Sequence, residues 1–301
     1  MVGDATAAVT STAAPGRRRW YRPIAFGLSI HLLAWAVVVF WAIASGAIRR
    51  EEFGWDARLF AGFGQRFLET GQAYYPVQLA GSYLAEGVVN LYPPITLYLF
   101  VPFAYLPLVL WWVIPLGIFG WHVWSCRPAP WTWPILALVL GLIPTVGALV
   151  YGGTILWSVA FICIGLRHPI VGALLGFKPT DAVMCVLFVR HRSFWIGVAL
   201  MGLLAIPFGD LWIQWWTAIS NIESGSPLRN VMGVPMLLLP VVAWVGRSHR
   251  VAAAGDDRQP GAKPAARLGR LGLERRDRVK AVDVGRLPFM RVSKPPWSTP
   301  G

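Results

Sequence analysis

The residue in this sequence that is most suited to take part in a chemical reaction is Asp56, an acid placed among large apolar side chains. If Trp55–Glu69 forms a helix, Asp56 lies on one apolar face of that helix. Such a helix would lie flat at a membrane surface with this face downward. Desolvation there raises the pKa of a carboxyl group, which is how a general base is tuned. The apolar members of the face are Leu59, Phe60, Phe63 and Phe67.

The same position also suits a structural role for Asp56. An Asp at the start of a helix can cap it by accepting a hydrogen bond from the backbone N–H of residue 58 or 59. The two roles are compatible, and the sequence leaves both open. A neighbouring cation would lower the pKa of the carboxyl group, and Arg58 and Arg66 on the same helix are the candidates.

A second charged residue, Lys178, lies inside the otherwise apolar run Pro169–Val189. A charge within a membrane span is costly, so it faces a cavity, a partner or an interface. Three interpretations stay open for it: an ion pair with Asp181 three residues later, binding of a phosphate group, and snorkelling to the interface. Pro179 would break a helix at this point.

The elements that carry these residues have the composition of an integral membrane protein. Of the 301 residues, 56% are hydrophobic and only 14% are charged, whereas a soluble domain has about 25% charged residues. The net charge is +13, and thirteen of the 27 Lys and Arg residues follow Val245. Basic residues that flank apolar runs predict cytoplasmic anchors, so we expect a lipid bilayer and no nucleic acid as partner.

The apolar runs predict an all-α fold, a polytopic transmembrane helical bundle with about eight spans. The first span is Ile24–Gly46, and the loop Ile48–Tyr92 after it would carry the interfacial helix on the extracytoplasmic side. An even number of spans together with the basic tail puts both termini in the cytoplasm. The remaining runs are Pro94–Leu106, Leu108–Trp124, Pro134–Tyr151, Ile155–Leu166, Pro169–Val189, Phe194–Pro207 and Val231–Val245.

Composition divides the chain into three parts. Residues 1–22 are expected to form a disordered cytoplasmic leader, residues 23–246 the transmembrane domain, and residues 247–301 a basic, disordered cytoplasmic tail. The tail either binds anionic lipid or is a solvated segment without a role. We expect no metal site and no cofactor, because the three cysteines form no CxxC pair and the histidines are scattered singly.

Several short motifs occur in an order that resembles a known family. They are Phe53–Asp56, Tyr74–Pro76, Leu91–Pro94 before an apolar run with Leu106-Pro107, Tyr151-Gly152, and Gly172–Gly176 followed by Lys178–Thr180. From residue 24 to residue 246 the chain is similar to the GT-C superfamily of integral-membrane glycosyltransferases. Within that superfamily it resembles the bacterial α-mannosyltransferases, common in actinobacteria, that use polyprenyl-phosphate-mannose.

The resemblance implies a GT-C-like fold in a bacterial plasma (inner) membrane. The family's first-loop acid corresponds to Asp56, which would deprotonate a sugar hydroxyl of a glycolipid or cell-envelope glycan acceptor. That hydroxyl would displace the polyprenyl phosphate from a mannosyl unit, or from another hexosyl or pentosyl unit, with inversion. Basic residues would stabilise the departing phosphate. The residues expected to bind substrate are Arg58, Arg66, Tyr75, Tyr92 and Lys178.

A different class of function stays open. The chain is shorter than most members of the family, so the resemblance implies a truncated member, and an inactive relative or a transporter-like subunit is the alternative. A transporter would need ionisable groups in several spans, and this chain offers essentially Lys178 and Asp181, which disfavours it. Tyr75 and Tyr92 either stack on sugar or anchor the chain at the interface.

Overall fold

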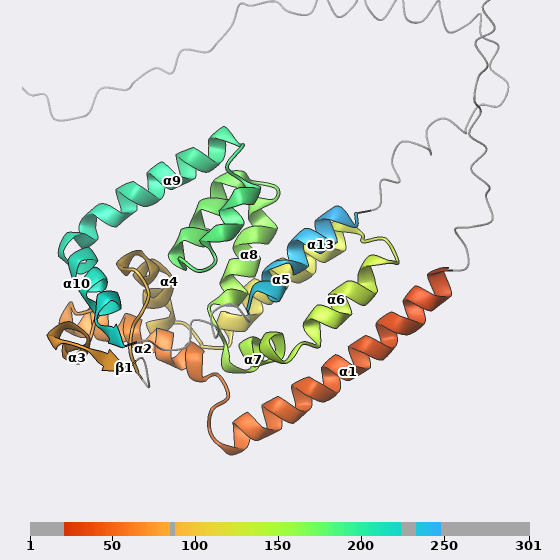
Figure 1. Cartoon of the computed structure of the whole chain (residues 1–301), viewed down its shortest axis with the longest axis horizontal. Helices are drawn as coiled ribbons and strands as arrows, with labels where there is room; N and C mark the ends of the chain where they lie inside the picture. The colour runs from red at the N-terminus through yellow and green to blue at the C-terminus, as the bar shows by residue number, and fades with distance from the viewer. Residues whose placement is uncertain (1–20, 85–87, 224–232, 248–301) are drawn as a thin grey trace, which may run out of the picture. The chain divides into compact units, whose positions relative to one another are not determined.

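The computed structural model describes residues 21–84, 88–223 and 233–247, and this part of the chain is mostly helical, as predicted (Figure 1). Tyr21 and Arg22, which were predicted to belong to a disordered leader, begin the first helix, and residues 1–20 and 248–301 of the predicted leader and tail lie outside the described residues. Two short strands, β1 (Tyr83–Leu84) and β2 (Ile222–Glu223), pair in parallel. The helices, with η for 3-10 helices, are α1 (Tyr21–Arg49), α2 (Trp55–Thr70), α3 (Pro76–Ala80), η1 (Pro94–Thr96), α4 (Leu97–Phe100), η2 (Val101–Ala104), α5 (Leu110–Cys126), α6 (Thr132–Leu140), α7 (Ile143–Tyr151), α8 (Ile155–Gly165), η3 (Pro169–Phe177), η4 (Ala182–Leu187), α9 (Arg192–Ala205), η5 (Ile206–Phe208), α10 (Gly209–Ser220), α12 (Val234–Leu237) and α13 (Leu239–Val245).

Two helical segments are long and apolar enough to cross a membrane. One is α1, and the other is the segment Arg192–Ser220, made of α9, η5 and α10. Helices α6 and α7 would give a third if they are counted together, although they are bent by 61°. The described residues therefore have the character of a membrane protein, but the predicted number of about eight spans is not confirmed.

Prolines account for part of this difference. The predicted span Pro169–Val189 is not one helix, because η3 and η4 are separated by a turn over Lys178–Asp181. Pro179 lies in this turn, where its missing N–H and its ring would disrupt a continuous helix. Pro144 lies in the first turn of α7, directly after the bend that separates α7 from α6.

Helix α2 is confirmed, at Trp55–Thr70, but its apolar face contacts protein. Phe60 and Phe63 are buried in the main core. The Phe60 ring stacks on Phe100 of α4, with 5.0 Å between ring centroids, and on Trp111 of α5, with 5.5 Å. The expectation that this face lies on the membrane surface is therefore wrong, because α4 and η2 cover it.

Helix α1 lies along α6 and α7 (Figure 1). Near its C-terminal end, Ala47 packs with Val146 and Val150 of α7 in a small separate core. Elsewhere α1 exposes large apolar side chains, among them Phe26 and Trp41. Many exposed apolar side chains on one helix indicate contact with a membrane or another protein, which agrees with α1 as a membrane span.

The close packing of α2 against α4 and η2 can be tested at Gly64. A Cβ on Gly64 would lie 2.6 Å from the Phe100 carbonyl oxygen and 2.9 Å from the Val101 Cα, which are backbone atoms. We expect Gly64→Ala to lower the free energy of unfolding by about 1–3 kcal/mol, because overpacking forces the backbone apart. The measurement is thermal unfolding of the full chain in detergent.

Gly62 on the same helix supplies the matched control. A Cβ on Gly62 would meet nothing within 4 Å, so Gly62→Ala should stabilise the chain by about 0.5–1 kcal/mol through helix propensity alone. Equal unfolding temperatures for Gly64→Ala and the wild type would contradict the close approach.

Candidate functional site

Asp56 is the second residue of α2, and it does not cap the helix. Gly54 holds the N-cap position with φ 70°, in the left-handed region, and no side chain caps the helix. The preceding chain is fixed by Arg58, which donates hydrogen bonds to the carbonyl oxygens of Phe53 at 2.5 Å and of Glu51 at 2.7 Å. The capping interpretation of Asp56 is therefore wrong, and its carboxylate is not engaged by the helix that carries it.

The Asp56 carboxyl group is half-buried against the turn between α7 and α8. Its Oδ2 atom lies 3.6 Å from the position that a Cβ would take on Gly153. Burial raises the pKa of Asp56 from 3.8 to about 6, and the positive charge of Lys178 opposes this rise. The neighbouring cation is thus Lys178, from the turn between η3 and η4, in place of the predicted Arg58 or Arg66.

Glycine is required in the turn between α7 and α8. Gly152 has φ 77°, and a Cβ there would lie 2.7 Å from the Trp112 ring and 2.8 Å from the Ala57 Cβ. The indole Nε1 of Trp111 donates a hydrogen bond to the Gly152 carbonyl oxygen at 2.8 Å. Because α2 and α5 both press on Gly152, the neighbouring Gly153 lies beside the acid of α2.

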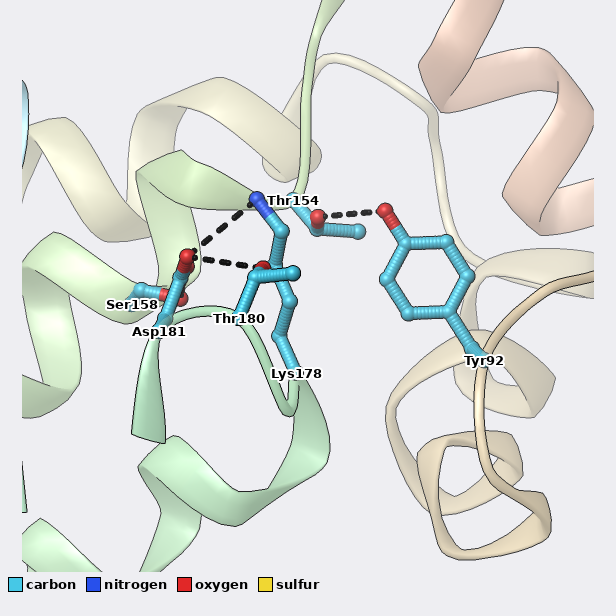
Figure 2. Close-up of polar contacts among 6 residues, drawn as sticks. All are labelled: Tyr92, Thr154, Ser158, Lys178, Thr180 and Asp181. Atoms are coloured by element: carbon cyan, nitrogen blue, oxygen red, sulfur yellow. Dashed lines mark hydrogen bonds and ion pairs between the residues drawn. The ribbon is translucent and has the colours of Figure 1, made fainter. Parts of the chain in front are cut away.

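Tyr92 joins this turn to α2. Its hydroxyl group forms a hydrogen bond of 2.8 Å with Oγ1 of Thr154 (Figure 2), and its ring packs edge-on against Phe60, with 5.3 Å between centroids. Burial raises the pKa of Tyr92 well above its usual value, and the carboxylates of Asp56 and Asp181 raise it further. The hydroxyl group therefore stays protonated and can donate a hydrogen bond.

A buried amide network, missed by the sequence analysis, fixes the chain that leads to Tyr92. The side chain of Asn90 accepts a hydrogen bond from the Tyr92 backbone N–H at 3.1 Å and donates one to the Ala73 carbonyl at 3.0 Å. Gln78 donates to the Asn90 carbonyl at 2.9 Å and accepts from the Tyr75 backbone N–H at 3.1 Å. Both amides are at most 1% exposed, so the loss of either would leave buried polar groups unpaired.

Lys178 and Asp181 form an ion pair with 3.4 Å between Nζ and Oδ1, which confirms the predicted local pairing. Asp181 is only 2% exposed, and its Oδ2 accepts a hydrogen bond of 2.6 Å from Ser158 of α8. In the view of Figure 2 the Lys178 side chain lies between Asp181 and Tyr92. Lys178 therefore acts on two carboxylates, Asp181 by direct contact and Asp56 through its charge.

The other three residues predicted to bind substrate have their own local contacts. Arg58 lines an open hollow of about 670 Å³ at the connection between α1 and α2, together with Phe53 and Trp55. The Arg66 guanidinium lies over the Tyr75 ring, 4.3 Å from its centroid. Lys178 is the cation whose charge lowers the pKa of Asp56. The binding roles of Arg58, Arg66 and Tyr75 stay predictions.

We define Asp56, Tyr92, Thr154, Lys178 and Asp181 as the Asp56 cluster. It combines a half-buried acid with a pKa near neutrality, a protonated hydroxyl group and an ammonium group. This set is suited to removing a proton from a hydroxyl group beside a bound anion. In the described ranges, no three His, Cys, Asp or Glu side chains are placed to hold a metal ion.

No family model, curated protein or solved structure matches this chain. The resemblance to the GT-C superfamily therefore rests on the quoted motifs and their order. Of the residues in those motifs, Asp56, Tyr92 and Lys178 come together in the cluster, although they lie in three separate parts of the sequence.

The raised pKa of Asp56 predicts a pH-dependent cost to stability. The folded state binds the Asp56 proton more tightly than the unfolded chain, so stability falls as the pH rises from about 4 to about 6 and stays lowered above that range. We expect Asp56→Asn to match the wild type near pH 4 and to be more stable by about 1–3 kcal/mol at pH 8. Thermal unfolding at both pH values is the measurement.

Glu69 provides the control for this experiment. It lies on the same helix, is exposed, and accepts a hydrogen bond from Gln65. Glu69→Gln should not reproduce the gain in stability at pH 8 that is expected of Asp56→Asn. A constant difference between Asp56→Asn and the wild type at pH 4 and pH 8 would contradict the raised pKa.

The ion pair of Lys178 with buried Asp181 predicts strong coupling between the two positions. We expect Lys178→Met alone to cost about 2–4 kcal/mol, because it leaves a buried carboxylate without its cation. The double variant Lys178→Met/Asp181→Asn should cost less than the sum of the single variants. Unfolding of all four proteins measures this coupling, and additive costs would show that the pair is not energetically linked.

Proposed function

We propose that this chain is a membrane glycosyltransferase that moves a mannosyl unit, or another hexosyl or pentosyl unit, from a polyprenyl-phosphate sugar to a glycolipid or cell-envelope glycan. The observation that carries the proposal is the position of Asp56, whose carboxyl group is half-buried against Gly153 and within range of the Lys178 charge, so that burial raises its pKa to about 6. A carboxyl group with this pKa is largely ionised at pH 7 and still basic enough to accept a proton. The neighbouring Lys178 ammonium group can hold an anionic leaving group.

In the proposed reaction, Asp56 takes the proton from a sugar hydroxyl of the acceptor. The hydroxyl oxygen attacks the anomeric carbon of the donor sugar, and the bond from that carbon to the phosphate oxygen breaks with inversion. The electron pair leaves with the polyprenyl phosphate. Lys178 stabilises the negative charge that develops on this phosphate. The Tyr92 hydroxyl group donates a hydrogen bond to the polyprenyl-phosphate sugar.

The pairing of Lys178 with Asp181 is compatible with this role. The buried Asp181 carboxylate, held by Ser158, fixes the position of the Lys178 ammonium group. The substrate phosphate would then share an ammonium group that is already in place.

The position of the cluster in the fold suits substrates that stay in lipid. Asp56 follows closely after α1, a helix of spanning length, so both a lipid-linked donor and a glycolipid acceptor would reach it from the bilayer. We propose a bacterial inner-membrane location, with this end of α1 extracytoplasmic, both termini cytoplasmic, and a GT-C-like arrangement of further, shorter spans.

The proposal predicts transfer activity that depends on Asp56. Membranes that contain the full chain should transfer radiolabelled mannose from polyprenyl-phosphate-mannose, and Asp56→Ala and Asp56→Asn should each lower the rate by about 100-fold to 10,000-fold, the usual contribution of a general base. The wild-type rate should rise with pH through about 6, as Asp56 ionises. Glu69→Gln should leave rate and profile unchanged.

The variant Lys178→Met tests the assignment of Asp56 through the pH dependence of the rate. The charge of Lys178 lowers the pKa of Asp56, so the rise in rate should move to higher pH in this variant. Equal activity in the wild type, Asp56→Ala and Asp56→Asn would remove Asp56 as the base.

A further inference from the structure

A group of positive charges lies where α5, α8 and α13 end. The Asp56 cluster lies at the N-terminal end of α8, so this group is at the opposite end of that helix. Arg127 follows α5, Arg167 follows α8 and Arg247 follows α13. The Arg167 guanidinium donates a hydrogen bond to Ser125 in the last turn of α5. Arg247 forms a β-bridge with Pro128, directly after α5. We define Arg127, Arg167 and Arg247 as the arginine face.

Two guanidinium groups of the arginine face lie on indole rings. Arg167 is 4.0 Å from the ring centroid of Trp121, and Arg247 is 4.0 Å from that of Trp244. Trp121 is 52% exposed and the nearby Trp124 is 80% exposed. Stacking occupies the flat face of a guanidinium and leaves its N–H donors at the edge. Exposed Trp beside Arg is typical of a membrane–water interface.

Described acidic residues do not offset this charge. They lie in the connection between α1 and α2, in α2, in the turn between η3 and η4, in α10 and in β2, and not where α5, α8 and α13 end. Neither Arg167 nor Arg247 forms an ion pair with a described residue. Arg167 and Arg247 therefore present positive charge to whatever lies against them.

Further positive charge lies toward the same end of the molecule. Gly197 of α9 packs against the Ile170 carbonyl, and Ile170 comes three residues after Arg167. Because the N-terminal part of α9 is therefore close to the start of η3, Arg190 and Arg192 extend the basic region, and both are exposed.

We propose that the arginine face binds the headgroup of an anionic phospholipid, with the phosphate oxygens accepting hydrogen bonds from Arg167 and Arg247. Guanidinium matches the geometry of phosphate oxygens. Apolar side chains exposed along α5, such as Val113 and Leu116, offer a surface for the acyl chains. This inference goes beyond the proposed glycosyl transfer and does not depend on it.

Helix dipoles offer a simpler reason for arginine at these positions. The C-terminal end of a helix carries partial negative charge, which each of the three arginines complements. That interaction would be the same in a protein that binds only neutral lipid. A comparison of headgroups therefore separates the two explanations.

The experiment is a titration of the purified full chain in neutral detergent with dioctanoyl-phosphatidylglycerol or dioctanoyl-phosphatidylcholine, followed by native mass spectrometry. We expect the anionic lipid to bind at least tenfold more tightly than the neutral one. Arg167→Gln/Arg247→Gln should weaken binding of the anionic lipid about tenfold to thirtyfold, from the usual contribution of juxtamembrane arginines. Binding of the neutral lipid should not change.

Two further variants make the result specific. Arg49→Gln/Arg50→Gln removes the same charge at the exposed far end of α1 and should leave binding unchanged. Trp121→Leu/Trp244→Leu keeps the charge but removes the stacking, and should weaken binding several-fold. Equal affinity for the two lipids, equal losses in both double arginine variants, or equally tight binding of free inorganic phosphate would overturn the proposal.

Discussion

The arrangement of the candidate site depends on one buried carboxylate, that of Asp181. A buried charge must be neutralised by neighbours, and here Ser158 of α8 and the Lys178 ammonium do so. Satisfying Asp181 therefore fixes the turn between η3 and η4 against α8 and decides where Lys178 lies. Burial raises the pKa of Asp56, and the charge of Lys178, from a segment distant in sequence, limits this rise.

Local patterns were sufficient to predict much of the candidate site. The spacing of apolar residues predicted α2 to within one residue, and the i, i+3 spacing predicted the Lys178–Asp181 pair. The motif containing Tyr92 was also recognised. That these residues meet in space was implied only by the resemblance, since no local pattern relates residues so distant in sequence.

The remaining features depend on packing between distant segments, which a single sequence does not reveal. Apolar runs show where lipid or core can form, but length alone does not separate a span from a buried helix, so the number of spans is not confirmed. The same ambiguity led to the wrong environment for Phe60, which is buried by protein. No periodic pattern in the sequence marks Gln78 and Asn90, because their structural role depends on the hydrogen bonds that they form elsewhere in the chain.

The packing of α2 against aromatic residues of α4 and α5 has a consequence in membranes of different thickness. Bilayers differ by a few ångströms among membranes, and long apolar helices adapt by tilting. Helix α1 exposes much of its surface and contacts mainly α6 and α7, whereas α2 is anchored by Phe60 to α4 and α5. The spacing between its acid and the opposing ammonium would then be buffered against changes in lipid composition.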